Sequence, residues 1–303
     1  MSIYFILLLM NMKSHTMPTA PVIIVGMHRS GTTMITKMLE NLGLFVGHQK
    51  EINHEALFFW HINNWIFDIT TSRADLPHNF RYLNPRTKEI LVHDLNYFVQ
   101  SRKKKTFLGK KHNHYKSIKD LDFPWGWKDP KNSFTIDLWK EVFPQAKVLH
   151  IYRNPIDSIK SFIERDLELK NKYTLNWKKK LKRYFLISQN YHPNFRLHSL
   201  EEGYQLWEEY VEKCMDLEKD FPDIMHVCYE SFLEEPALHL QKIAAFCGLN
   251  NEEADILKQV KSVKSDRRFA FTKDSDANHV YLKVKNKPLM KLLGYDDILT
   301  ELK

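Results

Sequence analysis

The sequence predicts an α/β fold of three layers, in which helices flank both faces of a central parallel sheet. Three short apolar runs rich in β-branched residues have the composition of buried parallel strands, at residues 21–25, 147–152 and 224–229. Between and after these runs, apolar residues recur at the longer spacing of helices. Strands that alternate with helices typically form a parallel sheet covered on both faces.

The first unit of this fold is a strand, a glycine-containing loop and a helix. The strand at 21–25 ends at Gly26, and a helical spacing of apolar residues runs from Thr33 to Leu42. Gly43 is suited to end that helix. Further helices are expected at 55–69, from Pro155 onward, at 207–220 and at 236–247.

The chain of 303 residues has room for one large α/β domain or two small ones. No internal repeat or low-complexity linker divides it, so we expect a single domain over residues 18–303. The apolar stretch at 3–10 is much shorter than the roughly 20 residues of a membrane span, and no positively charged segment precedes it. We therefore expect residues 1–17 to be a disordered leader or a mis-assigned translation start, and we expect no stable membrane span.

The formal net charge of +8 suits an anionic partner, such as a nucleic acid, a membrane surface or a charged small molecule. Much positive charge lies at 102–116, which we interpret either as a solvated loop or as an electropositive rim for an anionic acceptor or nucleotide. The three cysteines are too few and too scattered for a disulfide framework, which indicates a reducing compartment such as the cytoplasm. His112 and His114 have no cysteine or acidic residue nearby, so no metal site is predicted.

The loop after the first strand has the features of an anion cradle. A loop between a buried strand and a helix presents backbone N–H groups and the positive end of the helix dipole. Gly26 and Gly31 let the backbone approach an anion closely, Arg29 adds a positive charge, and Thr32 and Thr33 add hydroxyl donors. The same glycines would also suit a tight turn without a ligand.

This loop differs from the phosphate loop of nucleoside triphosphatases. Their motif places a lysine directly after the second glycine, where it reaches the terminal phosphates. Thr32 occupies that position here, and the positive residue, Arg29, lies inside the loop. Chemistry on a magnesium-bound triphosphate is therefore disfavoured.

Residues 28–33, with the sequence His-Arg-Ser-Gly-Thr-Thr, resemble the 5′-phosphosulfate loop of the sulfotransferases that use 3′-phosphoadenosine 5′-phosphosulfate (PAPS). Many of these enzymes have a lysine in place of Arg29. Residues 152–161 resemble the 3′-phosphate site of the same family, in which a serine follows an arginine by eight positions, as Ser161 follows Arg153. A guanidinium at a strand end and a hydroxyl two helical turns later can hold one phosphate.

Two further segments support the resemblance, which runs from about residue 21 to residue 249. Residues 125–131 resemble the bacterial-type and tyrosylprotein-like branches of the family, which implies that Lys128 reaches the transferring sulfonate or the bridging oxygen. Residues 229–232 resemble the segment whose tyrosine contacts adenine. The family implies a P-loop-like fold and nucleotide contacts from His28, Arg29, Ser30, Gly31, Thr32, Thr33, Arg153, Ser161 and Tyr229.

The adenine site departs from the family pattern at one position. Several relatives have a tryptophan that stacks on adenine where this chain has Met34, so adenine packing must come from elsewhere. Arg267 and Arg268 lie in a late basic segment, which we interpret either as closing over the nucleotide or as a solvated charge pair.

The resemblance implies in-line transfer of a sulfonate from PAPS to an acceptor hydroxyl or amine. Such a transfer needs a base for the acceptor proton, positive groups for the charge on the sulfonate and the leaving phosphate, and alignment of the two substrates. Arg29, Lys128 and the N–H groups of the loop would supply the positive groups. The scheme needs no metal.

The catalytic base is expected to be Glu55. Small-molecule sulfotransferases carry a histidine two residues after the lysine that aligns with Lys128, but this chain has Pro130 there. In the tyrosylprotein and carbohydrate-like branches a glutamate downstream of the first helix acts as the base, and Glu55 lies in the matching region. His54 and Glu51 are the other candidates, and a glutamate at a helix start can also merely interact with the dipole.

Two other functions are compatible with parts of the sequence. One is a P-loop kinase of small molecules, and the other is a non-catalytic protein that binds a nucleotide or polyanion mainly through residues 102–116. For the sulfotransferase we expect a small-molecule, glycan or lipid acceptor and no nucleic acid. The sequence does not indicate the oligomeric state.

Overall fold

The computed structural model describes residues 17–174, 177, 181 and 194–301. Four parallel strands form its sheet, in the order β2-β1-β3-β4. The three strands expected from the sequence are confirmed, whereas β2 was not expected. The strands are β1 (Val22–Val25), β2 (Gly126–Lys128), β3 (Lys147–Tyr152) and β4 (Ile224–Cys228).

Alternating residues of β1 show how the sheet separates two helical layers. Val22 and Ile24 face one apolar cluster, Ile23 and Val25 face another, and all four are almost completely buried. The first layer consists of α2 (Thr32–Asn41), α10 (Tyr229–Glu234), α11 (Pro236–Phe246) and α12 (Glu253–Val260). The second consists of α3 (Leu57–Ile69), α4 (Pro85–Gln100), α5 (Lys105–Leu108) and α6 (Asn132–Val142).

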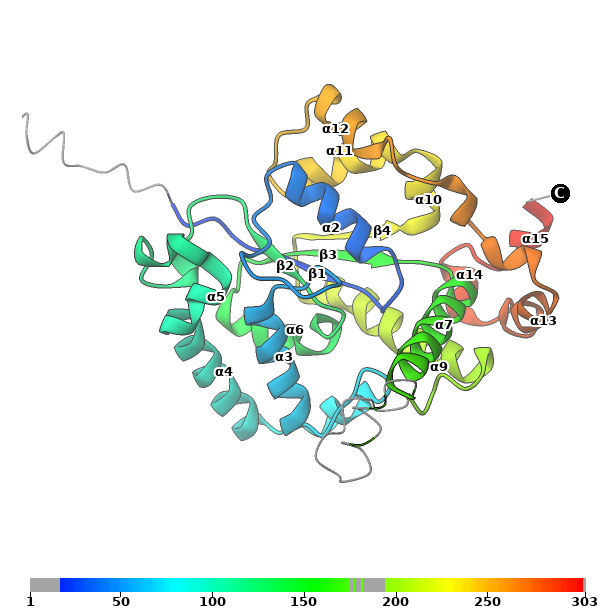
Figure 1. The fold of residues 1–303 in the computed structure, drawn as a ribbon, viewed down its shortest axis with the longest axis horizontal. Helices are drawn as coiled ribbons and strands as arrows, with labels where there is room; N and C mark the ends of the chain where they lie inside the picture. Colours follow the sequence, from blue (N-terminus) through cyan, green and yellow to red (C-terminus); the bar gives the residue numbers. More distant parts are fainter. Residues whose placement is uncertain (1–16, 175–176, 178–180, 182–193, 302–303) are drawn as a thin grey trace, which may run out of the picture.

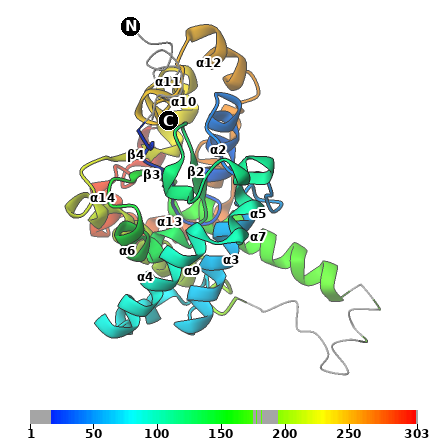
Figure 2. The same cartoon turned by 90° about the vertical axis from the view of Figure 1, so that its left-hand side faces the viewer.

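These layers lie on opposite sides of the sheet, with α2 and α11 above it and α3 and α4 below it in Figure 1; Figure 2 shows the same order after a quarter turn. The predicted three-layer α/β fold is therefore confirmed. Further helices pack around a separate apolar cluster beyond the carboxyl ends of the strands. They are α7 (Pro155–Thr174), α9 (Leu200–Met215), α13 (Ser275–Val284), α14 (Pro288–Leu292) and α15 (Ile298–Glu301).

Two predicted helices have different bounds. The helix expected at 55–69 begins at Leu57, because residues 50–56 form a tight loop closed by a bridge between Lys50 and Ala56. The helix expected at 207–220 begins earlier, at Leu200, where the side chain of Ser199 accepts a hydrogen bond from the backbone of Glu202 at 3.1 Å and caps the helix.

The prediction of one domain over 18–303 stays a prediction. The leader predicted at 1–17 lies outside the described residues except for Met17. Among the helices of the described residues, none combines the length and the hydropathy that a membrane span requires.

Candidate active site

The carboxyl ends of the four strands meet at one edge of the sheet, because all the strands are parallel. The residues that directly follow the strands there are Gly26, Asp129, Arg153 and Tyr229. All the segments that the sequence singled out as nucleotide-binding therefore converge on this edge.

The glycine-containing loop is held in its shape by close packing. Gly26 and Gly31 have φ angles of 142° and 96°, in a region that favours glycine. A Cβ atom on Gly26 would overlap the backbone oxygen of Ile151 in β3, and one on Gly31 would overlap the ring of Tyr229. The structure thus requires glycine at both positions.

The hydroxyl-bearing residues of the loop have different environments. The Oγ of Ser30 is buried without a hydrogen-bond partner in the described structure. Thr32 is the first residue of α2, and the Oγ1 of Thr33 donates to the backbone oxygen of Asn53 at 3.1 Å. The same oxygen accepts a hydrogen bond from Nζ of Lys128 at 2.7 Å, so Asn53 connects the loop to the end of β2.

Arg29 lies at the centre of a group of cations. Its Nε donates to Oγ of Ser161 at 2.9 Å. Burial lowers the pKa of Arg29, and Arg165, Arg153 and Arg267 lower it further. This concentration of positive charge favours a ligand with several negative charges.

Arg153 and Ser161 both lie near Arg29, but only Ser161 forms a hydrogen bond with it in the described structure. Arg153 donates from Nη2 to the backbone oxygen of Arg267 at 3.0 Å, and the same nitrogen lies 3.4 Å from the carboxylate of Asp157. The guanidinium also lies 4.9 Å from the ring centroid of Tyr229. Tyr229 is thus packed between Gly31 and Arg153, and it joins the two predicted phosphate motifs.

Asp157 is a residue of this site that the sequence analysis missed. Its carboxylate accepts hydrogen bonds from the backbone N–H groups of Ala270 and Phe271 at 3.1 and 2.8 Å. These bonds hold the segment around Arg267 against the start of α7. Arg268 instead pairs with Glu234. The sequence offered one signal for the position of Asp157. Asn154, three residues earlier, is a common helix-capping residue, and its side chain accepts a hydrogen bond from the backbone N–H of Asp157.

Glu55 and Lys128 form a buried ion pair at the end of β2. Nζ of Lys128 lies 2.8 Å from Oε1 of Glu55, and the two side chains are only 2% and 7% exposed. Burial raises the pKa of Glu55 to about 7; the ammonium of Lys128 opposes the shift and the carboxylate of Asp129 adds to it. A carboxyl group with this pKa can exchange a proton near neutral pH.

The two other candidate bases have different partners. Nε2 of His54 bonds to the carboxylate of Glu40 on α2. The carboxylate of Glu51 accepts hydrogen bonds from the backbone and side chain of Asn53. Among the three candidates, Glu55 alone forms an ion pair with Lys128 in the described structure.

A buried polar network, which the sequence analysis also missed, supports this pair. Nδ2 of Asn63, on α3, donates to the side chains of Asp129 and Asn132 at 2.9 and 2.8 Å. Its Oδ1 accepts hydrogen bonds from Thr135 and Trp139 at 3.0 and 2.9 Å. Asn63 therefore fastens α3 to the segment that follows Lys128.

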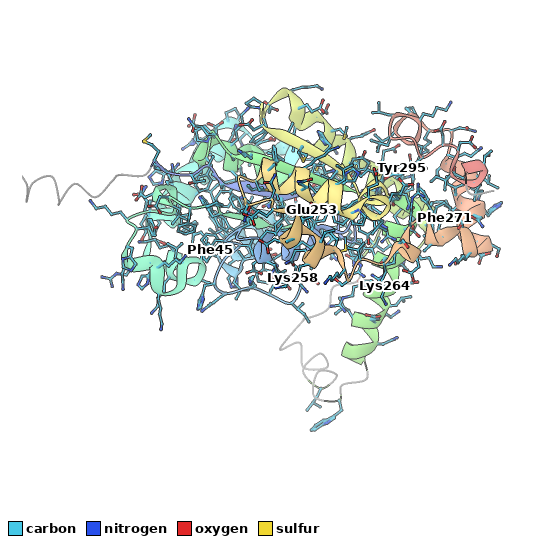
Figure 3. All side chains as sticks on the ribbon, turned by 90° about the horizontal axis from the view of Figure 1, so that it is seen from above. Phe45, Glu253, Lys258, Lys264, Phe271 and Tyr295 are labelled. Atoms are coloured by element: carbon cyan, nitrogen blue, oxygen red, sulfur yellow. The ribbon has the colours of Figure 1, made fainter. Side chains whose placement is uncertain are left out.

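The basic segment 102–116 is joined to the residues before the loop of Glu55, because the backbone oxygens of Phe107 and Thr106 accept hydrogen bonds from His48 and Gln49 at 2.7 and 3.2 Å, but it lies away from the nucleotide motifs. Lys111 lies over the rings of Phe45 and Phe123, at 5.1 and 4.3 Å. In Figure 3, Phe45 lies at the opposite end of the molecule from Phe271, whose N–H bonds to Asp157. The interpretation of this segment as a rim for the nucleotide gains no support from this position.

Residues 21–253 match the model of the sulfotransferase family. The chain belongs to the sulfotransferase family. The predicted PAPS-dependent sulfotransferase is thereby confirmed as an enzyme class, and the kinase and the non-catalytic binder are not favoured.

Solved structures of other sulfotransferases show distant likeness to this sulfotransferase, and no match is found among curated proteins. The sulfotransferase domain of the Synechococcus PCC 7002 olefin synthase is 18% identical, with a TM-score of 0.42 and coverage of 87% of this chain and 86% of that one. A sulfotransferase from Alicyclobacillus acidocaldarius is 18% identical, with a TM-score of 0.42 and coverage of 77% and 83%. The sulfotransferase domain of the curacin biosynthetic pathway is 11% identical, with a TM-score of 0.45 and coverage of 88% and 97%.

Proposed function

We propose that this sulfotransferase binds PAPS along the carboxyl edge of its sheet and uses Glu55 as the base. The buried pair between Glu55 and Lys128, 2.8 Å apart at that edge, is the observation that carries the proposal. It combines a proton acceptor whose pKa is about 7 with a fixed positive charge, which are the two groups that in-line sulfonate transfer needs.

The loop would hold the 5′-phosphosulfate of PAPS. Its N–H groups at the start of α2, the guanidinium of Arg29 and the hydroxyl of Thr32 are suitable donors, and the hydroxyl of Thr33 would exchange its hydrogen bond to Asn53 for one to the anion. His28 and Ser30 belong to the same loop and would shape it around the anion. The crowding of Gly31 by Tyr229 supports a tight cradle.

Arg153 and Ser161 would hold the 3′-phosphate, and Tyr229 would contact the adenine. Arg267, beside Arg153, supports this assignment by adding a further positive charge. Arg153 is balanced by Asp157, and a bound phosphate would take over part of that interaction.

In the transfer step, the carboxylate of Glu55 takes the proton of the acceptor hydroxyl or amine as the oxygen or nitrogen attacks sulfur. The bond between sulfur and the bridging oxygen breaks, and adenosine 3′,5′-bisphosphate (PAP) leaves. Lys128 and Arg29 would stabilise the charge on the sulfonate and on the leaving phosphate.

The acceptor is a small molecule, a glycan or a lipid in this proposal. We also propose that the enzyme works in the cytoplasm. The support for this location is that Cys214, Cys228 and Cys247 are all free thiols.

Replacing Arg153 with methionine is expected to weaken PAP binding by about 10- to 100-fold, because a charge-assisted hydrogen bond contributes about 1.5–3 kcal/mol. Isothermal titration calorimetry on the purified chain measures the change. Arg268→Met is the matched control, since Arg268 pairs with Glu234, and its affinity for PAP should stay near that of the wild type. Equal losses in both variants would contradict the assignment of the 3′-phosphate to Arg153.

A further inference from the structure

Lys131 is a cation beside the active site to which the proposed nucleotide contacts give no role. It lies three residues after Lys128, at the start of α6. Its Nζ is 5.9 Å from the ring centroid of Trp60 and 5.8 Å from that of Phe67, both on α3. Within the described residues, no carboxylate lies within ion-pair distance of it.

The face of α3 beneath this ammonium has the character of a binding surface. Trp60, Asn64 and Phe67 follow one another at spacings of four and three residues, so they lie on the same side of the helix. Because Lys131 is almost equally far from the rings of Trp60 and Phe67, its ammonium lies between them, on the face of α3 that also carries Asn64. Trp60 is partly exposed and can offer a flat surface to a ring.

Two buried nitrogen atoms in this region have no hydrogen-bond partner in the described part of the chain. They are Nδ2 of Asn64 and Nε2 of His28, and the His28 ring stacks on Phe162 at 4.9 Å. A buried donor without a partner costs free energy. An oxygen of a ligand that enters beside Lys131 would provide the missing acceptor.

The electrostatic environment of His28 shows that the region favours anions. Burial and the ammonium groups of Lys131 and Lys128 together lower the pKa of His28 to about 3. His28 is therefore neutral at physiological pH, and the net charge beside it is positive. Both lysines act on this ring, so Lys131 lies within electrostatic range of the loop that carries Arg29.

We propose that Lys131, Asn64 and Trp60 form an acceptor subsite for an oxyanion. The acceptor of this sulfotransferase is then a ring-containing hydroxyl compound that also bears a carboxylate or a sulfate group. This inference rests on the proposed function, in which Arg29, Lys128 and Arg153 serve the nucleotide and leave Lys131 for the second substrate. The ammonium pairs with the oxyanion, Asn64 donates to one of its oxygens, and Trp60 packs against the ring.

Paired ligands that differ only in this charge test the subsite. In the presence of saturating PAP, calorimetry would measure binding of 4-nitrophenyl β-D-glucuronide and of its methyl ester, and of 4-hydroxyphenylacetate and its methyl ester. Each free acid is expected to bind about tenfold more tightly than its ester, a difference of about 1.4 kcal/mol. In Lys131→Met the ratio is expected to fall to about one, and Lys131→Arg should restore it.

Lys140→Met is the matched control. Lys140 lies on the same helix and pairs with the exposed Asp220, so its loss changes the net charge equally without touching the stripe. The inference is overturned if the esters bind as tightly as the acids, if neither acid binds, or if the ratio persists in Lys131→Met. It is also overturned if Lys131→Met weakens PAP binding itself, since Lys131 would then serve the nucleotide.

The failure of the proposed function has a different signature. If wild-type protein does not bind PAP, the assignment of the nucleotide site is wrong. The acceptor subsite, which is defined relative to the nucleotide site, then fails with it. If PAP binds to wild type and to Lys131→Met with equal affinity but the acids show no advantage, only the inference about the acceptor fails.

Discussion

Glu55→Gln is expected to lower kcat by a factor of about 10² to 10⁴, the usual contribution of a general base. Glutamine keeps the shape of the side chain but cannot accept the acceptor proton. PAP affinity should stay unchanged, because no nucleotide contact is assigned to Glu55. Turnover of labelled PAPS with an active acceptor, together with PAP calorimetry, measures both quantities.

The pH dependence gives an independent readout of the same residue. Because the base works as the carboxylate and its pKa is about 7, the kcat of the wild type should rise as the pH increases through 7. In Glu55→Gln this rise should be absent. The raised pKa also implies that the folded state holds a proton between pH 4.5 and 7 that the unfolded chain releases, so the contribution of Glu55 to stability declines as the pH rises through that interval.

Glu51→Gln is the matched control, since Glu51 lies in the same loop and bonds to Asn53 instead of Lys128. Its kcat should be close to that of the wild type. Glu55→Gln removes a charged partner of the buried Lys128, which lowers the stability of the fold. A thermal melt of each variant therefore serves to check that the variant is folded. If the Glu51 variant loses turnover and the Glu55 variant keeps it, the base has been misassigned.

Asn63→Leu is expected to lower the free energy of unfolding by about 3 kcal/mol or more. The leucine would leave several buried groups unpaired, and each such group costs about 1–3 kcal/mol. The groups that would lose their hydrogen bond to Asn63 include the carboxylate of Asp129 and the indole nitrogen of Trp139. Urea denaturation followed by tryptophan fluorescence measures the change.

Asn41→Ala provides the comparison for this variant. Asn41 is an exposed residue at the end of α2 that bonds to Gln259, and its replacement should change the free energy of unfolding by only about 0.5 kcal/mol. If the two asparagine variants are equally stable, the network around Asn63 is not what fastens α3 to the segment after Lys128.

The strands that could be predicted are those whose side chains are apolar on both faces, such as β1 and β3. β2 was missed because it has only three residues, one of them glycine, and it exists through its pairing with β1. Gly126 is required there because a Cβ atom would overlap the backbone oxygen of Val22. This constraint comes from the neighbouring strand and leaves no local signal in the sequence.

The candidate site was predictable where a motif has a fixed spacing. The spacing of Arg153 and Ser161 placed both residues beside one loop, but it could not show that Ser161 bonds to Arg29. Asp157 and Asn63 were missed because their partners lie far away in the chain, at Phe271 and Asp129. Such pairs form only when the helices pack, so their residue types alone do not reveal them.

The central claim is that the carboxyl edge of the sheet binds PAPS. Its most direct test is a thermal denaturation of the wild-type chain with PAP and, separately, with ATP and magnesium. PAP at about 100 times its dissociation constant should stabilise the fold by about 2.7 kcal/mol. No stabilisation by PAP, together with clear stabilisation by ATP and magnesium, would contradict the account.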